Sequence, residues 1–143
     1  SAMQRAFGRR VRRDARSKHA LLTAVPMGGK RNAREAARLK AEGALAGCPD
    51  ILCFESGGVM YVSEVAPLTA FDPRRGAPIS SSGMVMRGSF AGLAIEFKVG
   101  KNKATPLQEW WHRELRRCGW RVEICYSADE AWGALCDHLG VRD

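Results

Sequence analysis

The chain has 143 residues, of which 45% are hydrophobic, so it suits one domain with a core of its own. No apolar run is long enough for a membrane span or a signal sequence, and this excludes a membrane-embedded protein. The formal net charge is +8, and residues 1–40 carry twelve basic residues against two acidic ones. This basic end indicates a polyanionic partner, with nucleic acid preferred to a membrane surface. The alternative for residues 1–16 is a solvated, disordered tail.

The first third of the chain predicts two helices. Residues 4–25 form one basic helix with an apolar stripe that includes Leu22, and Pro26 breaks it. Asn32 and Glu35, three residues apart, predict a capping box that opens a second helix. Ser1-Ala2-Met3 ahead of these helices resembles a cloning remnant.

The next part predicts a short strand and then an insertion. Asp50 follows a proline and opens the apolar run 51–54, which predicts a strand over residues 50–54. Residues 55–89 are rich in glycine, serine and proline, and we expect an inserted hairpin or loop. Short strands are expected there over 59–65 and 84–86.

Residues 90–99 predict the clearest strand of the chain. Leu93, Ile95, Phe97 and Val99 alternate with Ala94, Glu96 and Lys98. Because side chains alternate across a strand, Glu96 and Lys98 share one face while Phe97 points into the core.

The last third predicts a helix, a strand and a helix. Thr105 and Gln108 form a capping box, with a proline between them, and Gly119 ends this helix. Residues 121–126 predict a strand, and Ser127 opens a last helix that runs to position 139. A strand–helix–strand unit over 90–126 implies a parallel pair, so the fold class is α/β.

The cysteines are odd in number and none is in C-x-x-C spacing, which argues against a zinc site and a disulfide framework. Two of them fall in apolar strands, so we expect buried, reduced thiols of a cytoplasmic protein. The five are Cys48, Cys53, Cys118, Cys125 and Cys136.

Two other residue types, histidine and tryptophan, receive an interpretation from their spacing. None of the three histidines has metal-ligand spacing to another, and we place His19, His112 and His138 on the surface or on helix faces. Of Trp110 and Trp111, we expect one in the core and the other partly exposed, available for base stacking or a dimer contact.

Asp50, Glu96 and Lys98 predict a site for phosphodiester chemistry. This reaction needs an activated water and neutralisation of the extra negative charge of the transition state. Carboxylate oxygens from neighbouring strands bind Mg²⁺ or Mn²⁺, which supply both, and the carbonyl of Phe97 adds a ligand. Lys98 would orient or activate the water, or offset phosphate charge. The alternative is an ordinary strand, because Glu-x-Lys is frequent in strands.

Several short motifs follow one another along the chain: residues 28–31 (GGKR), 39–43 (LKAEG), 46–51 (AGCPDI), 92–98 (GLAIEFK) and 105–110 (TPLQEW). Together they resemble the VRR-NUC branch of the PD-(D/E)xK nuclease superfamily, in its compact stand-alone phage and bacterial form. The resemblance covers residues 21–139 apart from the insert at 55–89. It implies one domain over 1–143 with a restriction-endonuclease-like core, a small mixed central sheet flanked by helices. It also implies a cytoplasmic place in a bacterium or a phage-infected cell.

The resemblance implies a role for each site residue. Asp50 and Glu96 would be catalytic metal ligands, with the Phe97 carbonyl beside them. Lys98 would be the catalytic lysine, and Gln108 the motif glutamine near the site, with plain helix capping as the alternative. Other basic residues would contact phosphates, or alternatively form a solvated surface. These candidates are Lys30, Arg31, Arg34, Lys101 and Lys103.

The chain departs from the family pattern at the first helix. Family members place a glutamate there, facing the metal, whereas no glutamate precedes Glu35 in this chain. Gln4 and Asp14 are the only loose substitutes. The sequence therefore predicts one metal held by Asp50 and Glu96, and leaves a second metal open. Met27 also stands where an asparagine is common.

The resemblance implies a hydrolase, a divalent-metal-dependent and structure-specific DNA endonuclease. One small domain cuts one strand, so we expect a homodimer acting on four-way (Holliday) junctions or other branched DNA. One alternative is a nuclease for flaps, single strands or plain duplex. Another is a DNA-binding module whose catalytic site has degenerated.

Overall fold

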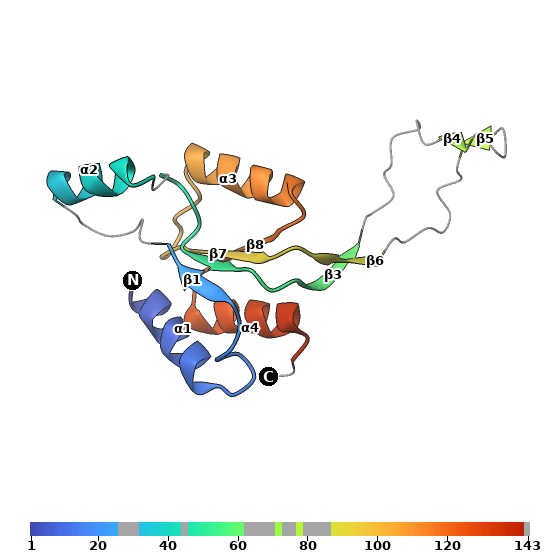
Figure 1. Cartoon of the computed structure of the whole chain (residues 1–143), viewed down its shortest axis with the longest axis horizontal. Coiled ribbons are helices and arrows are strands. Elements are labelled where there is room, and N and C mark those ends of the chain that lie inside the picture. Colours follow the sequence, from blue (N-terminus) through green and yellow to red (C-terminus); the bar gives the residue numbers. More distant parts are fainter. Residues whose placement is uncertain (26–31, 44–45, 62–70, 73–76, 79–86, 142–143) are drawn as a thin grey trace. The chain divides into compact units, whose positions relative to one another are not determined.

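A computed structural model describes residues 1–25, 32–43, 46–61, 71–72, 77–78 and 87–141 of the chain. The chain divides into two compact units. One consists of Ser1–Gly58 with Phe90–Asp143, and the other of Val59–Ser89. The first unit holds the main sheet and the long helices (Figure 1).

The main sheet has four strands. β1 runs antiparallel to β2, β2 antiparallel to β7, and β7 parallel to β8. The predicted parallel pair and the mixed sheet of an α/β fold are therefore confirmed. In spatial order the strands are β1 (Leu22–Ala24), β2 (Ile51–Cys53), β7 (Leu93–Phe97) and β8 (Arg121–Cys125).

Helices cover both faces of this sheet (Figure 1). Two helices, α1 and α4, lie against each other on one face, and α3 lies on the other. Within the described residues, no helix is long and apolar enough to cross a membrane. The helices of the described residues are α1 (Ala2–Arg13), α2 (Ala33–Ala41), α3 (Pro106–Arg117) and α4 (Ala128–Leu139).

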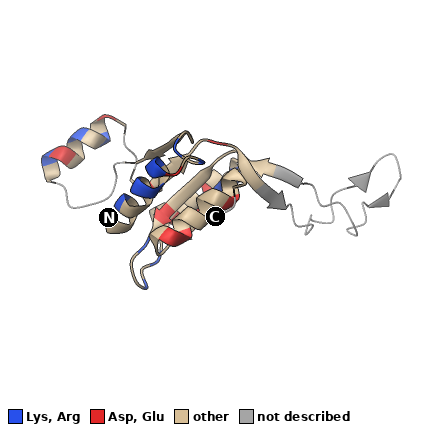
Figure 2. Cartoon of the chain, turned by 90° about the horizontal axis from the view of Figure 1, so that it is seen from below, with Lys and Arg blue, Asp and Glu red and all other residues tan. Residues whose placement is uncertain are grey.

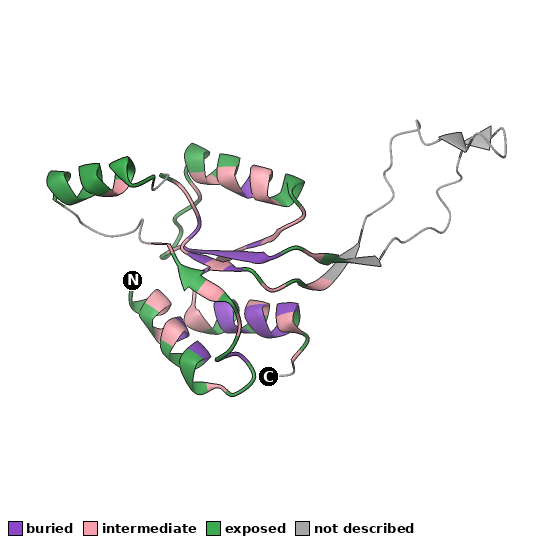
Figure 3. Cartoon of the chain, in the orientation of Figure 1, coloured by how far each residue is buried: buried purple, intermediate pink, exposed green. Residues whose placement is uncertain are grey.

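The core lies between the sheet and the pair α1–α4. Phe7 of α1 packs edge-on against Phe97 of β7, with ring centroids 6.0 Å apart. Trp132 and Leu135 of α4 are fully or almost fully buried, and Figure 3 shows the burial concentrated on β7 and α4. Cys53 and Cys125 are buried free thiols, as predicted.

The helix predicted over residues 4–25 is wrong in its second half. α1 ends at Arg13, because Asp14 takes an extended conformation and its carboxylate accepts the backbone N–H of Arg16 at 2.9 Å. Leu22 then pairs with Cys53 as part of the edge strand β1. Long-range pairing with β2 overrides the local helical pattern.

The predicted strands around the insert are shifted in the structure. β3 (Gly57–Tyr61) overlaps the strand expected over 59–65, while residues 84–86 lie outside the described residues. β3 pairs with β6 (Arg87–Phe90), so Phe90 belongs to β6 and not to β7. β4 (Phe71–Asp72) and β5 (Ala77–Pro78) form a separate antiparallel pair.

Of the three histidines expected on the surface or on helix faces, His19 is exposed, whereas His112 and His138 lie on buried faces of α3 and α4. His112 is 3% exposed and His138 1% exposed. His138 is tolerated in the core because its Nε2 lies 2.6 Å from the Glu55 carbonyl oxygen. The prediction that Trp110 or Trp111 lies in the core is wrong: Trp110 is 46% exposed and Trp111 is only half-buried. The buried residue of α3 is His112.

Candidate active site

Four polar side chains meet where β2 begins and β7 ends. The register that places Ile51 opposite Ile95 brings Asp50, one residue before β2, beside the end of β7. The Oδ2 atom of Asp50 accepts the backbone N–H of Phe97 at 2.8 Å. Glu96, the neighbour of Phe97, therefore lies next to a second carboxylate.

Gln108, from the first turn of α3, joins the side chains of this site. Its Nε2 donates to Glu96 Oε1 at 2.6 Å, and its Oε1 accepts from Lys98 Nζ at 2.5 Å. The same Oε1 accepts the backbone N–H of Thr105 at 2.9 Å, which completes the predicted capping box. Gln108 thus caps α3 and also holds Glu96 and Lys98, whose charged atoms are 3.4 Å apart.

A glycine fixes the segment that carries Asp50 against α3. Gly47 has a φ of 81°, and a Cβ there would lie 2.7 Å from the Leu107 side chain. Beside it, the indole N–H of Trp111 donates to the carbonyl of Ala46 at 2.9 Å. This close approach brings the Asp50 segment onto the same helix that supplies Gln108.

Burial and neighbouring charge both disfavour the ionised form of the Glu96 carboxylate. It is 3% exposed, and burial, followed by the nearby charge of Asp50, raises its pKa to about 7, although Lys98 opposes the shift. Its Oε2 is buried and has no hydrogen-bond partner within the described residues. Burial and the same two carboxylates also raise the pKa of Cys48, a neighbour that no spacing pattern identified.

These residues fit a hard divalent cation. Lys98 offsets one of the two neighbouring carboxylate charges, and the buried, unpartnered oxygen of Glu96 remains costly unless a further positive charge joins it. Asp50 and Glu96 would supply two oxygen ligands and leave the remaining positions to the Phe97 carbonyl, water or substrate. Within the described residues, no three Asp, Glu, His or Cys side chains gather into a larger ligand set.

The predicted phosphate contacts are only partly placed. Lys30 and Arg31 lie outside the described residues. Arg34 is exposed on α2, and Lys101 and Lys103 are exposed in the turn between β7 and α3. That turn connects Lys98 to Gln108, so Lys101 and Lys103 lie in sequence between two residues of the site.

The two candidate substitutes for a first-helix glutamate, Gln4 and Asp14, form no hydrogen bond or ion pair with the site in the described residues. Asp14 ends α1, and its pKa is lowered to about 2 by hydrogen bonds from Arg16. Gln4 lines a groove between α1 and β1.

No model of a known protein family matches the chain, and no curated protein matches it. A solved structure described as a VRR_NUC domain protein is similar to it, with a TM-score of 0.62 and 19% sequence identity. The match covers 99% of this chain and 88% of that one. At this identity the likeness concerns the fold, and it confirms the nuclease-like architecture expected from the resemblance of the motifs.

Proposed function

We propose that this protein is a divalent-metal-dependent endonuclease that hydrolyses phosphodiester bonds in branched DNA. The observation that carries the proposal is the joined set of Asp50, Glu96, Lys98 and Gln108, with one buried carboxylate oxygen left unpaired. A carboxylate pair with an adjacent ammonium group is the combination that metal-assisted phosphodiester hydrolysis needs. The fold shared with a VRR_NUC domain protein is consistent with this chemistry.

Asp50 and Glu96, with the Phe97 carbonyl, would hold Mg²⁺ or Mn²⁺. Bound there, such an ion lowers the pKa of a water and offsets phosphate charge. Lys98 is only 12% exposed and carries its positive charge into the site, where it binds a phosphate oxygen or orients the attacking water. Gln108 is a positioning residue, because one side chain holds both Glu96 and Lys98.

We propose a four-way junction as the preferred substrate and a homodimer as the active form, in the cytoplasm. One such site cuts one strand, and two copies related by a two-fold axis match the symmetry of a junction. Two exposed apolar side chains on α3, Leu107 and Trp110, offer surface for a second copy.

A cleavage panel tests this function. Four-way junction, flap, single-stranded and duplex DNA are incubated with Mg²⁺ or Mn²⁺, and the cut strands are separated by size. We expect symmetric cuts in the junction and slower cutting of duplex. Equal cutting of plain duplex would show that junction specificity is wrong.

Variants separate the catalytic site from the rest of the chain. Glu96→Gln and Lys98→Met should each lower the cleavage rate by about 10²-fold or more, because each removes a charge from the transition-state environment. Glu109→Gln, an exposed carboxylate on the same helix as Gln108, is the control and should keep its rate. Equal losses in all three would contradict the assigned site.

A second candidate is a DNA-binding module without cleavage. It is favoured by the small ligand set, since only two carboxylates meet in the described part of the site. A wild-type protein that binds junctions but cuts none of the panel with either metal would establish it.

A further inference from the structure

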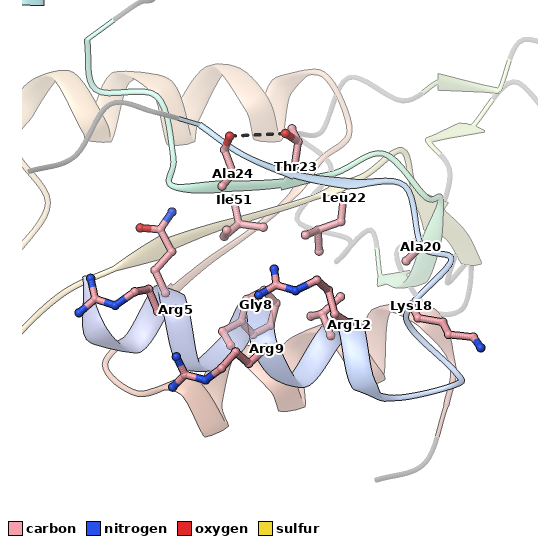
Figure 4. Close-up of a pocket in the computed structure, with 13 residues that line it drawn as sticks. Arg5, Gly8, Arg9, Arg12, Lys18, Ala20, Leu22, Thr23, Ala24 and Ile51 are labelled. Carbon is pink, nitrogen blue, oxygen red and sulfur yellow. Dashed lines mark hydrogen bonds between the residues drawn. The ribbon is translucent and has the colours of Figure 1, made fainter. Parts of the chain in front are cut away.

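A groove lies between α1 and the edge strand β1, with a volume of about 680 Å³ (Figure 4). Phe7 of α1 lines it from the helix, and Leu22 and Ile51 line it from the sheet. Ile51 and Glu96 belong to opposite faces of the sheet, since Glu96 bonds to α3 and its strand neighbours pack toward α1. The groove is therefore separate from the candidate active site.

Four cations line this groove, and all are exposed. Within the described residues none of the four has a carboxylate at ion-pair distance. By contrast, Arg10 on the same helix pairs with Asp129 at 3.0 Å and lies over the Trp132 ring. Like charges gathered without partners repel one another and attract an anion. The four residues are Arg5, Arg9, Arg12 and Lys18, and Figure 2 shows the basic residues along α1.

The spacing of the arginines matches a row of phosphates. Arg5, Arg9 and Arg12 are four and then three residues apart, so they share one side of α1 and span roughly 10 Å of its axis. A single strand that keeps the base stacking of a double helix carries about three phosphates over that length. Gly8 lies between them without a side chain, and a Cβ there would be 3.4 Å from the Arg12 guanidinium, which lies over it in Figure 4.

The edge of the sheet supplies backbone hydrogen-bond donors beside the groove, and one end of the groove lies at the segment of Asp50. The antiparallel ladder with β2 directs the N–H groups of Leu22 and Ala24 away from the sheet, on the side of its open edge. At one end of the groove, Ala24 pairs with Ile51, and the N–H of Val25 donates to the carbonyl of Asp50 at 2.8 Å. The groove therefore ends at the segment that carries a catalytic carboxylate.

The size of the groove selects the occupant. A volume of about 680 Å³ is that of a pocket for one small molecule. A duplex, whose major groove alone is about 12 Å wide, is too broad to enter it. A single strand can enter, with its backbone against the arginines and its bases near the apolar wall.

We propose that this groove binds one unpaired strand of DNA and leads it to the start of β2, where Asp50 lies. The choice of DNA rests on the proposed nuclease function. The substrate would then be branched DNA with an unpaired strand at the branch.

Binding is measured with the full chain in a chelator, so that no cleavage occurs. Fluorescence anisotropy follows a labelled single strand and a blunt duplex between about 50 and 200 mM salt. The test variant is Arg5→Gln/Arg12→Gln, and the control with the same charge change is Arg113→Gln/Arg117→Gln on α3. Circular dichroism checks that each variant is folded, and Arg5→Lys/Arg12→Lys tests rescue.

We expect the groove variant to bind the single strand about tenfold more weakly and to lower the salt slope by roughly one to two. The lysine variant should retain binding, and duplex affinity should fall no further than in the control. An equal loss in the control pair, an equal loss for duplex, or no loss would each overturn the proposal.

Cleavage with Mn²⁺ is read separately. If strand binding depends on Arg5 and Arg12 while nothing is cut, the groove stands and the nuclease function fails. If junctions are cut and single-strand binding does not depend on Arg5 and Arg12, the nuclease function is supported and the groove proposal fails.

Discussion

At the scale of single residues, Glu96 is held between opposing forces. Burial and Asp50 favour its protonated form, whereas Lys98 favours the carboxylate. Its Oε1 is bonded to Gln108, and its Oε2 has no partner in the described residues. Such a carboxylate costs stability when it is ionised, and a bound cation relieves that cost.

The pH dependence of metal-free stability follows from this shift. The folded pKa of Glu96, about 7, lies above its ordinary value of 4.5, so between these values the folded protein binds more protons than the unfolded chain. The stabilising contribution is present below about pH 4.5 and is lost as the pH rises through 7. Glu96→Gln should therefore be more stable than wild type at about pH 8, by on the order of 2 kcal/mol, and similar to it near pH 4.5.

Urea unfolding in a chelator at both pH values measures this difference. Glu109→Gln serves as the control for the loss of one exposed carboxylate. A Glu96→Gln variant less stable than wild type at about pH 8 would contradict the prediction.

Metal binding should show the same proton competition. Because a ligand carboxylate must be ionised, Mn²⁺ should raise the melting temperature more at about pH 8 than at about pH 6. Differential scanning fluorimetry measures the shift, and Glu96→Gln should lose most of it. A shift of equal size in wild type and variant would place the metal elsewhere.

At the scale of elements, local signals defined most of the parts that hold the site. Thr105 and Gln108 predict the start of α3 through a capping box, which the structure contains. The alternation of apolar and polar residues predicts the two faces of β7. The boundary between α1 and β1 escaped this reading, because basic residues continue past Arg13 and the strand exists only through pairing with β2. That error also hid the groove between the two elements.

Two glycines give opposite predictions for the same substitution. At Gly92 a Cβ would lie 2.6 Å from the Trp120 ring and 2.7 Å from the Cys53 carbonyl oxygen. Gly92→Ala should therefore destabilise the protein by about 1–3 kcal/mol. At Gly133, inside α4, a Cβ meets nothing within 4 Å, and Gly133→Ala should stabilise by up to about 1 kcal/mol. Denaturant unfolding compares them, and the same sign for both would contradict the packing described.

At the scale of the whole molecule, the described core belongs to one unit. The buried cluster draws on α1, β2, β7, β8 and α4, all outside residues 59–89. The two points where the insert departs lie close together, since a Cβ on Gly58 would be 3.0 Å from the Phe90 ring. A short turn can therefore join them with little loop-closure cost.

Replacing residues 59–89 by a short Asn-Gly turn should leave a folded protein. We expect a cooperative melt, because the core neighbours of the buried Trp132 remain. Cleavage of the junction panel then shows whether the insert is needed for substrate choice. A molten or aggregated product would show that the first unit depends on the insert.

The sequence by itself named the candidate site residues and most of the elements that carry them. Caps, strand alternation and the order of motifs are local signals, so Asp50, Glu96, Lys98 and Gln108 could be named before their positions were known. Only the tertiary structure decided the bond from Gln108 to both charges, the burial that shifts the pKa of Glu96, and the pairing of β1 with β2. These depend on residues far apart in the chain, and burial and pairing across that distance leave no periodic trace in the sequence.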